Sequence, residues 1–291
     1  ACLSSAAMIP PAPPAPLLTD RKALDAQRAR ALALPDPALF LQEAAIDDVQ
    51  ERLGAVNRTF TDLAVVSGFP DLWRAAFPQA RVIADTAVLD LKEASQDLVI
   101  HAMCLHWADD PVGQLVQCRR ALRPDGLLLC LFFGGQTLQE LRAVLAEAEA
   151  EVLGGLSPRV LPMAEIREAG ALLHRAGFAL PVADSDTRRV SYRDAFHLMA
   201  DLRAMGEGNA LASRLRRPVP RGLFLRAAQI YAANFPAEQG RVSATFETIC
   251  LTGWAPHEGQ QKPLRPGSAA QRLADALNVT ERRLPDGKPG G

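Results

Sequence analysis

The residues best suited to chemistry follow two short apolar runs near the middle of the chain. His106 and Trp107 come soon after the run 98–100, and two glycines, 134–135, come directly after the run 127–133. If both runs are parallel strands, the residues that follow them meet at one edge of the sheet, where such sheets bind ligands. His106 and Trp107 then form the wall of a pocket or simply close the top of the sheet. The residues alone leave both interpretations open.

The segment 96–135 that carries these residues predicts a strand, a helix and a second strand. The first run is apolar and β-branched, as expected of a strand buried on both faces. Asp110 suits a helix N-cap and Pro111 the first helical position. The turn residues at 123–126 then separate this helix from the apolar run. Two buried strands joined by one helix indicate a right-handed βαβ unit in a parallel sheet.

Strands and helices alternate along the rest of the chain. We expect further strands at 63–66, 81–85, 180–190 and 242–252, and helices at 19–33, 36–53, 137–153, 163–175, 192–205 and 221–233. Asp36, Ser191 and the pair Thr137 and Glu140, which has capping-box spacing, are the predicted helix starts. This order favours an α/β fold with a doubly wound, mostly parallel sheet, N-terminal helices and a helical cap at about 191–235. The last strand is expected to be antiparallel.

Composition divides the 291 residues into three parts. Residues 1–18 are proline-rich and lack the charged start of a signal peptide, so we expect a disordered leader, with Met8 as a candidate initiator. Residues 19–255 form the folded domain. Residues 256–291 are polar and proline-rich and are expected to be a flexible tail, with a short helix near 271–277.

Charge and cysteine usage exclude several classes of function. The net charge of −1 gives no electrostatic basis for binding nucleic acid or an anionic membrane. The five cysteines are scattered without metal-ligand spacing, which predicts no metal site and indicates buried thiols in a reducing cytoplasm. No apolar run reaches the roughly 18 residues of a membrane span, so we expect no transmembrane segment.

Longer motifs resemble a known family. DLVIHAMCLHWADDP at 97–111 and LRPDGLLL at 122–129 resemble class I S-adenosylmethionine-dependent methyltransferases of type 11. More specific runs are similar to the family of assembly factor 5 of mitochondrial respiratory complex I and its alphaproteobacterial relatives: GGLSPRVLPM at 154–163, LMADLRAMGEGNA at 198–210 and ATFETICLTGW at 244–254. The resemblance implies a Rossmann-like methyltransferase fold. It also implies modification of a complex I subunit, by methylation or by arginine hydroxylation.

The chain departs from the family where the cofactor would bind. The family has a glycine-rich DLGCGxG-like loop after its first strand, but this chain has VVSGFPDLW at 65–73. Phe69 fills space there, and Pro70 offers no N–H. Residues 71–80 are too few for a helix, a strand and a further helix, so a βα unit is expected to be missing. We therefore expect binding of S-adenosylmethionine to be weak or absent.

The resemblance nominates residues for two sites, although no catalytic residue is identified. The candidate cofactor-binding residues are Ser67, Gly68, Asp85, His106 and Trp107. Asp85 corresponds to the family's acidic residue near the adenine or, in another register, near the ribose, or it is merely a polar residue at a strand end. The candidate substrate-binding residues are Arg203, Glu207 and Asn209, although without the resemblance a solvated helix face is the favoured interpretation.

Three functions remain open. The first is a methyltransferase-like protein with a degenerate cofactor loop that acts on or binds a protein partner, such as a complex I subunit, during assembly. The second is a non-catalytic pseudomethyltransferase that serves as a binding module. The third is a carrier-protein or small-molecule methyltransferase, and the run at 198–210 weighs against it.

Overall fold

The computed structural model describes residues 17–260. The chain divides into one unit that ends at Pro256 and a second that begins at His257, of which only the turn at 257–260 is described. The first 16 residues of the expected leader lie outside the described residues. So do the tail beyond residue 260 and its predicted short helix.

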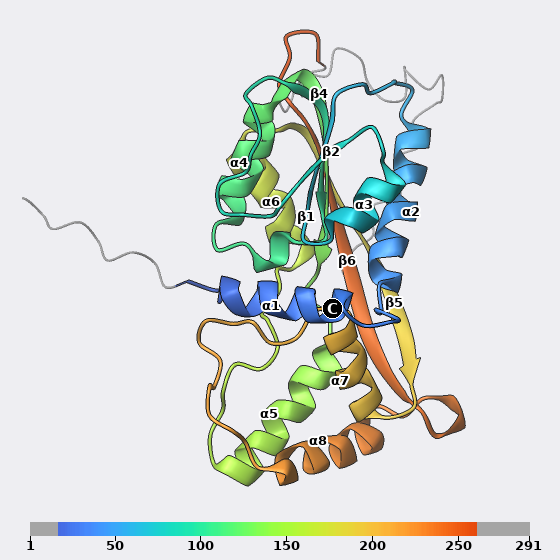
Figure 1. Cartoon of the computed structure of the whole chain (residues 1–291), viewed down its shortest axis with the longest axis vertical. Helices are drawn as coiled ribbons and strands as arrows, with labels where there is room; N and C mark the ends of the chain where they lie inside the picture. The colour runs from blue at the N-terminus through green and yellow to red at the C-terminus, as the bar shows by residue number, and fades with distance from the viewer. Residues whose placement is uncertain (1–16, 261–291) are drawn as a thin grey trace, which may run out of the picture. The chain divides into compact units, whose positions relative to one another are not determined.

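A six-stranded sheet in the order β2-β1-β3-β4-β6-β5 forms the centre of the first unit (Figure 1). Its strands are β1 (Leu63–Ser67), β2 (Arg81–Ile83), β3 (Gln96–Ala102), β4 (Leu122–Phe133), β5 (Ala179–Tyr192) and β6 (Val242–Trp254). The strands β2, β1, β3 and β4 are parallel neighbours, whereas β6 runs antiparallel to both β4 and β5. The predicted parallel core and the antiparallel last strand are therefore confirmed.

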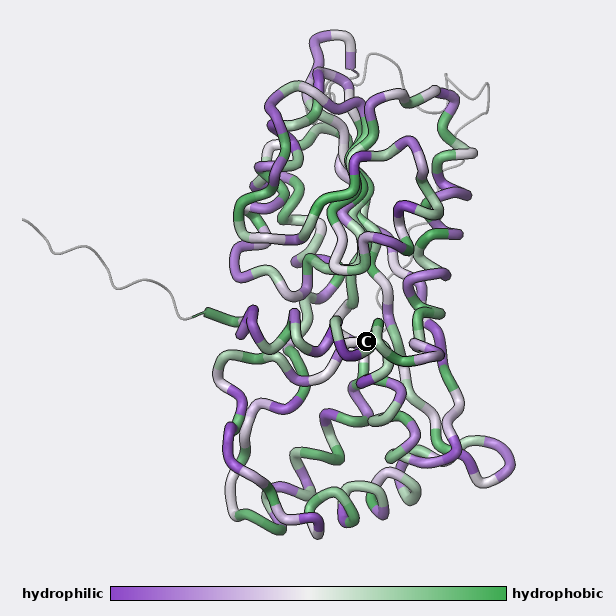
Figure 2. The backbone as a smooth tube through the Cα atoms, viewed as in Figure 1, coloured by the Kyte–Doolittle hydropathy of each residue, from purple (hydrophilic) through white to green (hydrophobic). Residues whose placement is uncertain are grey.

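Burial on both faces explains the apolar runs in the central parallel strands. All residues of β1 and of β3 are buried. Side chains alternate between faces, so Val65 and Ile100 join one apolar cluster while Val66 and Val99 join the other. Figure 2 shows hydrophobic residues concentrated along these strands.

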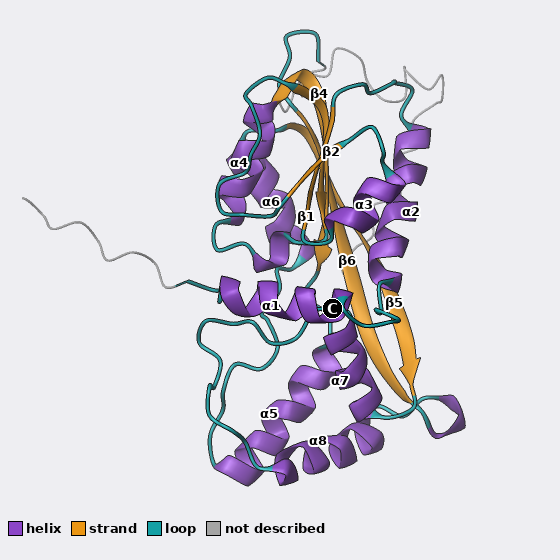
Figure 3. Ribbon diagram, viewed as in Figure 1, coloured by secondary structure: helices purple, strands orange, loops and turns teal. Residues whose placement is uncertain are grey.

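Helices cover both faces of the sheet (Figure 3). They are α1 (Arg21–Leu32), α2 (Phe40–Ala55), α3 (Pro70–Ala76), α4 (Pro111–Ala121), α5 (Gln139–Leu153), α6 (Ile166–Ala176), α7 (Ala195–Ala204) and α8 (Arg221–Asn234). The helices α4 and α6 pack on one face and α2 and α3 on the other, while α5, α7 and α8 group together as the cap. This architecture is the expected α/β fold with a doubly wound, mostly parallel sheet. No helix in the described part of the chain is long and apolar enough to cross a bilayer.

The connection from β1 to β2 is short. The seven-residue helix α3 alone joins the two strands, and β2 is the edge of the sheet. The strand β2 also stops at Ile83, so Asp85 lies in the loop beyond it rather than at the end of the predicted strand 81–85.

The capping box predicted at the start of α5 is wrong. The hydroxyl of Thr137 donates to the carbonyl of Glu247 and accepts from its N–H, both at 3.0 Å. Glu140 accepts a hydrogen bond from the N–H of Thr245 at 3.1 Å. Both side chains thus bind β6, and α5 begins only at Gln139, after Leu138 in the left-handed conformation.

The N-caps predicted for α7 and α2 are also wrong. Ser191 belongs to β5, where it pairs with Ser243, and Asp194 caps α7 by accepting from the N–H of His197 at 2.8 Å. Asp36 precedes α2 by several residues, and Leu39 occupies its N-cap position without a side-chain hydrogen bond. For α7, the pairing of Ser191 with β6 moves the helix start to Asp194.

Candidate functional site

A pocket of about 670 Å³ opens among α1, α5, α7 and the segments 159–163 and 207–209. Four residues named from the sequence line it: Trp107, Arg203, Glu207 and Asn209. Trp107 therefore forms part of a pocket wall, which is one of the two alternatives left open for it, and the segment 205–209 borders the same cavity. Gly134 and His106 were expected at this cavity as well, but neither lines it.

His106 supports the pocket from behind. Its side chain is 1% exposed and lies between the rings of Trp107 and Phe133, with centroids 5.8 and 4.9 Å away. The N–H of Phe133 donates to its Nδ1 at 3.5 Å, which leaves the ring proton on Nε2, 3.4 Å from Glu207. His106 therefore holds the Glu207 carboxylate in place.

Glu207 is a buried carboxylate in which only one oxygen has a hydrogen-bond partner among the described residues. Its Oε2 accepts a hydrogen bond from the indole N–H of Trp107 at 2.8 Å, whereas its Oε1 has no partner among the described residues. Burial raises the pKa of Glu207, but the hydrogen bonds from His106 and Trp107 and the charge of Arg28 together hold this pKa below its usual value. An ionised carboxylate with a free acceptor atom thus lines the pocket.

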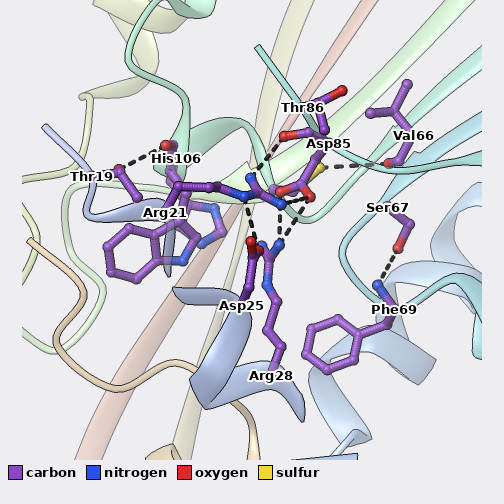
Figure 4. A network of polar contacts seen from close by, with 12 residues as sticks. Thr19, Arg21, Asp25, Arg28, Val66, Ser67, Phe69, Asp85, Thr86 and His106 are labelled. Atoms are coloured by element: carbon purple, nitrogen blue, oxygen red, sulfur yellow. Dashed lines mark hydrogen bonds and ion pairs between the residues drawn. The ribbon is translucent and has the colours of Figure 1, made fainter. Parts of the chain in front are cut away.

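Asp85 is already bound by two arginines of α1 (Figure 4). Nη1 of Arg28 donates to its two oxygens at 3.0 and 2.8 Å, and Nη2 of Arg21 donates to Oδ1 at 2.5 Å. Burial raises the pKa of Asp85, but the two guanidinium groups lower it by more than burial raises it. The pKa of Asp85 is therefore below its usual value. Both oxygens of this carboxylate are therefore occupied within the chain.

Arg28 also fills the space beside Gly68. A methyl group built at Gly68 would lie 2.3 Å from Cζ of Arg28, so the guanidinium packs directly on this glycine. Phe69, which is 2% exposed, lies beside it with its ring centroid 5.8 Å from Cζ, and the N–H of Phe69 is bound by the hydroxyl of Ser67 at 2.9 Å. Gly68 and Asp85 thus contact Arg28, Ser67 binds the backbone of Phe69 in the same loop, and none of the three lines the pocket.

These residues do not fit S-adenosylmethionine in the manner of class I methyltransferases. Backbone approach at the first loop is blocked by Arg28 and Phe69, and the candidate carboxylate has no free oxygen. Among residues 17–260, no group of three His, Cys, Asp or Glu side chains could hold a metal ion.

Arg21 and Arg28 were missed in the sequence. They stand seven residues apart, which is two helical turns, and so they share one face of α1. Two arginines at this spacing on an N-terminal helix indicate that the helix binds an anionic group, but the spacing does not identify the residue that carries the negative charge.

Comparisons with known proteins agree with the fold. Residues 46–130 match the Methyltransferase domain family. The arginine-hydroxylase NDUFAF5 of Danio rerio is 39% identical over 202 residues, which cover 69% of this chain and 63% of that protein. A malonyl-[acyl-carrier protein] O-methyltransferase of Xylella fastidiosa is 36% identical over 179 residues, which cover 62% of this chain and 58% of that protein. The chain thus spans about three fifths of the length of these relatives.

The solved structure of a putative methyltransferase from Bacillus halodurans is also similar. It aligns with 73% of this chain and 99% of its own, with a TM-score of 0.47 and 14% sequence identity.

Proposed function

We propose that this chain, which is similar to class I methyltransferases and to NDUFAF5, binds a protein partner during assembly of respiratory complex I. The partner inserts an arginine side chain into the pocket beside Trp107 and Glu207. The observation that carries this proposal is the buried, ionised Glu207 at the pocket wall, whose Oε1 has no hydrogen-bond partner among residues 17–260. Protein binding also agrees with the name of the relative, which is an arginine hydroxylase.

A guanidinium is the partner that this carboxylate lacks. A buried acceptor without a hydrogen bond is unfavourable by about 1–3 kcal/mol, and more when it is charged. The planar guanidinium donates to a carboxylate in a fixed geometry, and its face also stacks on aromatic rings such as that of Trp107. Glu207 and Trp107, joined by a 2.8 Å hydrogen bond, offer both features at one place.

The arrangement supports a binding module better than a methyltransferase. A carrier-protein methyltransferase, like the relative from Xylella fastidiosa, would need a methyl donor at the first loop. In this chain Arg28 occupies that place. We therefore include in the proposal that S-adenosylmethionine binding is weak or absent. We also place the protein in the cytoplasm, since its four described cysteines are buried free thiols.

The test uses a fluorescent nonapeptide of glycine and serine with one central arginine, measured by anisotropy. We expect wild-type protein to bind it and Glu207→Gln to bind at least about tenfold more weakly, because a charge-assisted hydrogen bond is lost. Glu151→Gln is the matched control, because Glu151 is half-exposed on the distant part of α5 and pairs with Arg226. Equal binding of a peptide with citrulline in place of arginine would contradict the proposal, since citrulline keeps the shape but not the charge.

A further inference from the structure

The pocket has two chemically different parts. Its polar end consists of Trp107 and Glu207. Most of its remaining wall is apolar and comes from α5, α8, β4, β6 and the segment 160–163. Leu141 and Leu145 lie one turn apart on one side of α5, and Leu138, which precedes the helix, and Phe246 of β6 line the pocket with them.

The volume is far larger than a guanidinium needs. Pockets of about 300–1,000 Å³ hold whole drug-sized ligands, and this pocket of about 670 Å³ lies within that range. An arginine held at Glu207 occupies only one end. Water in the remaining part would find few polar partners, and a second charge there would be unfavourable. The apolar part is therefore suited to a second, apolar group.

Charged residues at the rim of the pocket restrict which residues can lie next to the apolar group of a bound ligand. Arg30 of α1 and Arg203 of α7 line the pocket and are exposed, and neither has an acidic partner in the described part of the chain. Their charges disfavour further basic residues at the entrance. Glu207 inside the pocket disfavours a bound carboxylate, such as the head group of a free fatty acid. A protein segment with an arginine beside an apolar residue satisfies all of these conditions.

We infer that the apolar wall around Leu141, Leu145 and Phe246 is a second subsite, which takes a large apolar side chain adjacent to the partner's arginine. This inference rests on the proposed function and adds sequence selectivity to it. The arginine fixes the polar end of the partner segment, and the neighbouring apolar side chain fills the rest of the pocket. The partner is thus recognised by a pair of residues.

The experiment compares three peptides that differ only next to the arginine, which is preceded by phenylalanine, serine or lysine. For the wild-type protein we expect the phenylalanine peptide to bind at least about tenfold more tightly than the serine peptide, and the lysine peptide to bind most weakly. Ala200→Phe narrows the pocket from an exposed position on α7, so the fold is retained. In this variant the preference for phenylalanine should fall to about twofold or less. Ala233→Phe, at an exposed position on α8 that does not line the pocket, should retain the preference.

The outcomes separate the inference from the function on which it rests. If the arginine is required but phenylalanine and serine peptides bind equally, the subsite is wrong and the proposed function stands. If arginine and citrulline peptides bind equally or not at all, the proposed function fails and the subsite fails with it. Displacement of the phenylalanine peptide by micromolar dodecanoate would also overturn the inference, because the apolar wall would then serve a free acyl chain.

Discussion

Arg28 and Asp85, 57 residues apart in the chain, form a buried ion pair in which one guanidinium nitrogen lies 2.8 Å from Oδ2 and 3.0 Å from Oδ1. Both side chains are about 5% exposed or less. The pair ties α1 to the loop after β2 and also positions the guanidinium on Gly68. One contact therefore closes the place where a class I methyltransferase would hold its cofactor.

Asp85→Ala should strongly destabilise the protein. The substitution leaves Arg28 buried without its counter-charge, and removing one partner of a buried ion pair lowers the free energy of unfolding by about 3–5 kcal/mol. Urea denaturation followed by circular dichroism measures this change. Asp71→Ala is the control, because the pair Asp71–Arg74 is exposed and is worth about 1 kcal/mol or less. Similar unfolding midpoints for the two variants would contradict the prediction.

The ion pair between Arg28 and Asp85 also predicts how the stability of the protein changes with pH. The pKa of Asp85 is lower in the folded protein than its ordinary value of 3.8, so its contribution to stability is present above that value. This contribution is lost as the pH falls through the folded pKa, which places the loss below about pH 4. Urea denaturation between pH 7 and pH 2.5 should show a shallower loss of stability for Asp85→Asn than for the wild type. Parallel curves would show that Asp85 is not the group concerned.

Gly68→Ala tests the packing of Arg28 on the loop. The new methyl group would lie 2.3 Å from Cζ and 2.4 Å from Nη1 of Arg28, so the guanidinium must move. We expect a loss of about 1–3 kcal/mol in the free energy of unfolding. In an Arg28→Ala background the same substitution should lower it by less than about 1 kcal/mol, because the clash is absent. A double-mutant cycle measures the coupling, and additive effects would contradict the contact.

The described cysteines should be unreactive in the native protein. Cys104, Cys118, Cys130 and Cys250 are buried free thiols. Burial raises the pKa of Cys130 to about 11 and that of Cys250 to about 12, so few thiolates form at neutral pH. In a Cys2→Ser variant, labelling by a thiol reagent at pH 8 should be slow in buffer and rapid in 6 M urea. Rapid labelling of one thiol in buffer would show that its segment opens locally.

The parallel core could be predicted from the sequence because burial on both faces leaves a clear pattern. Most of β1 and the centre of β3, residues 98–100, are apolar runs, and their neighbours in the sheet followed from the alternation with helices. The rule for strand ends also pointed to Trp107 as a candidate pocket residue.

The remaining features depend on partners that local sequence does not reveal. Thr137 and Glu140 have capping-box spacing, but β6 offers both of them tertiary hydrogen bonds. Asp85 has the position of a ligand-binding carboxylate, but α1 supplies two arginines that occupy it. A competing interaction at long sequence separation decided each case. The unusual residues of the loop, Phe69 and Pro70, could be read from the sequence, but the two arginines that bind Asp85 could not.

The last prediction concerns S-adenosylmethionine. Isothermal titration should show no binding by the wild-type protein at micromolar ligand. Each unmade hydrogen bond to the ribose is unfavourable by about 1–3 kcal/mol, which corresponds to about tenfold to a hundredfold in affinity. Asp85 could make these bonds only by giving up Arg21 and Arg28. The backbone at Gly68 is covered by the same guanidinium.

A triple variant tests whether the contacts of Arg28 and the residues of the first loop prevent S-adenosylmethionine from binding. Arg28→Gly combined with Phe69→Gly and Pro70→Gly removes the guanidinium, the buried ring and the proline without an N–H, and leaves Asp85 paired with Arg21. If this variant binds S-adenosylmethionine and the wild type does not, the blocked loop is the cause. If neither binds, the missing βα unit between β1 and β2 is the greater obstacle. Micromolar binding by the wild-type protein would contradict the prediction, because α1 would then have to leave the loop on binding, and Arg28 would be a movable cover of a working cofactor site.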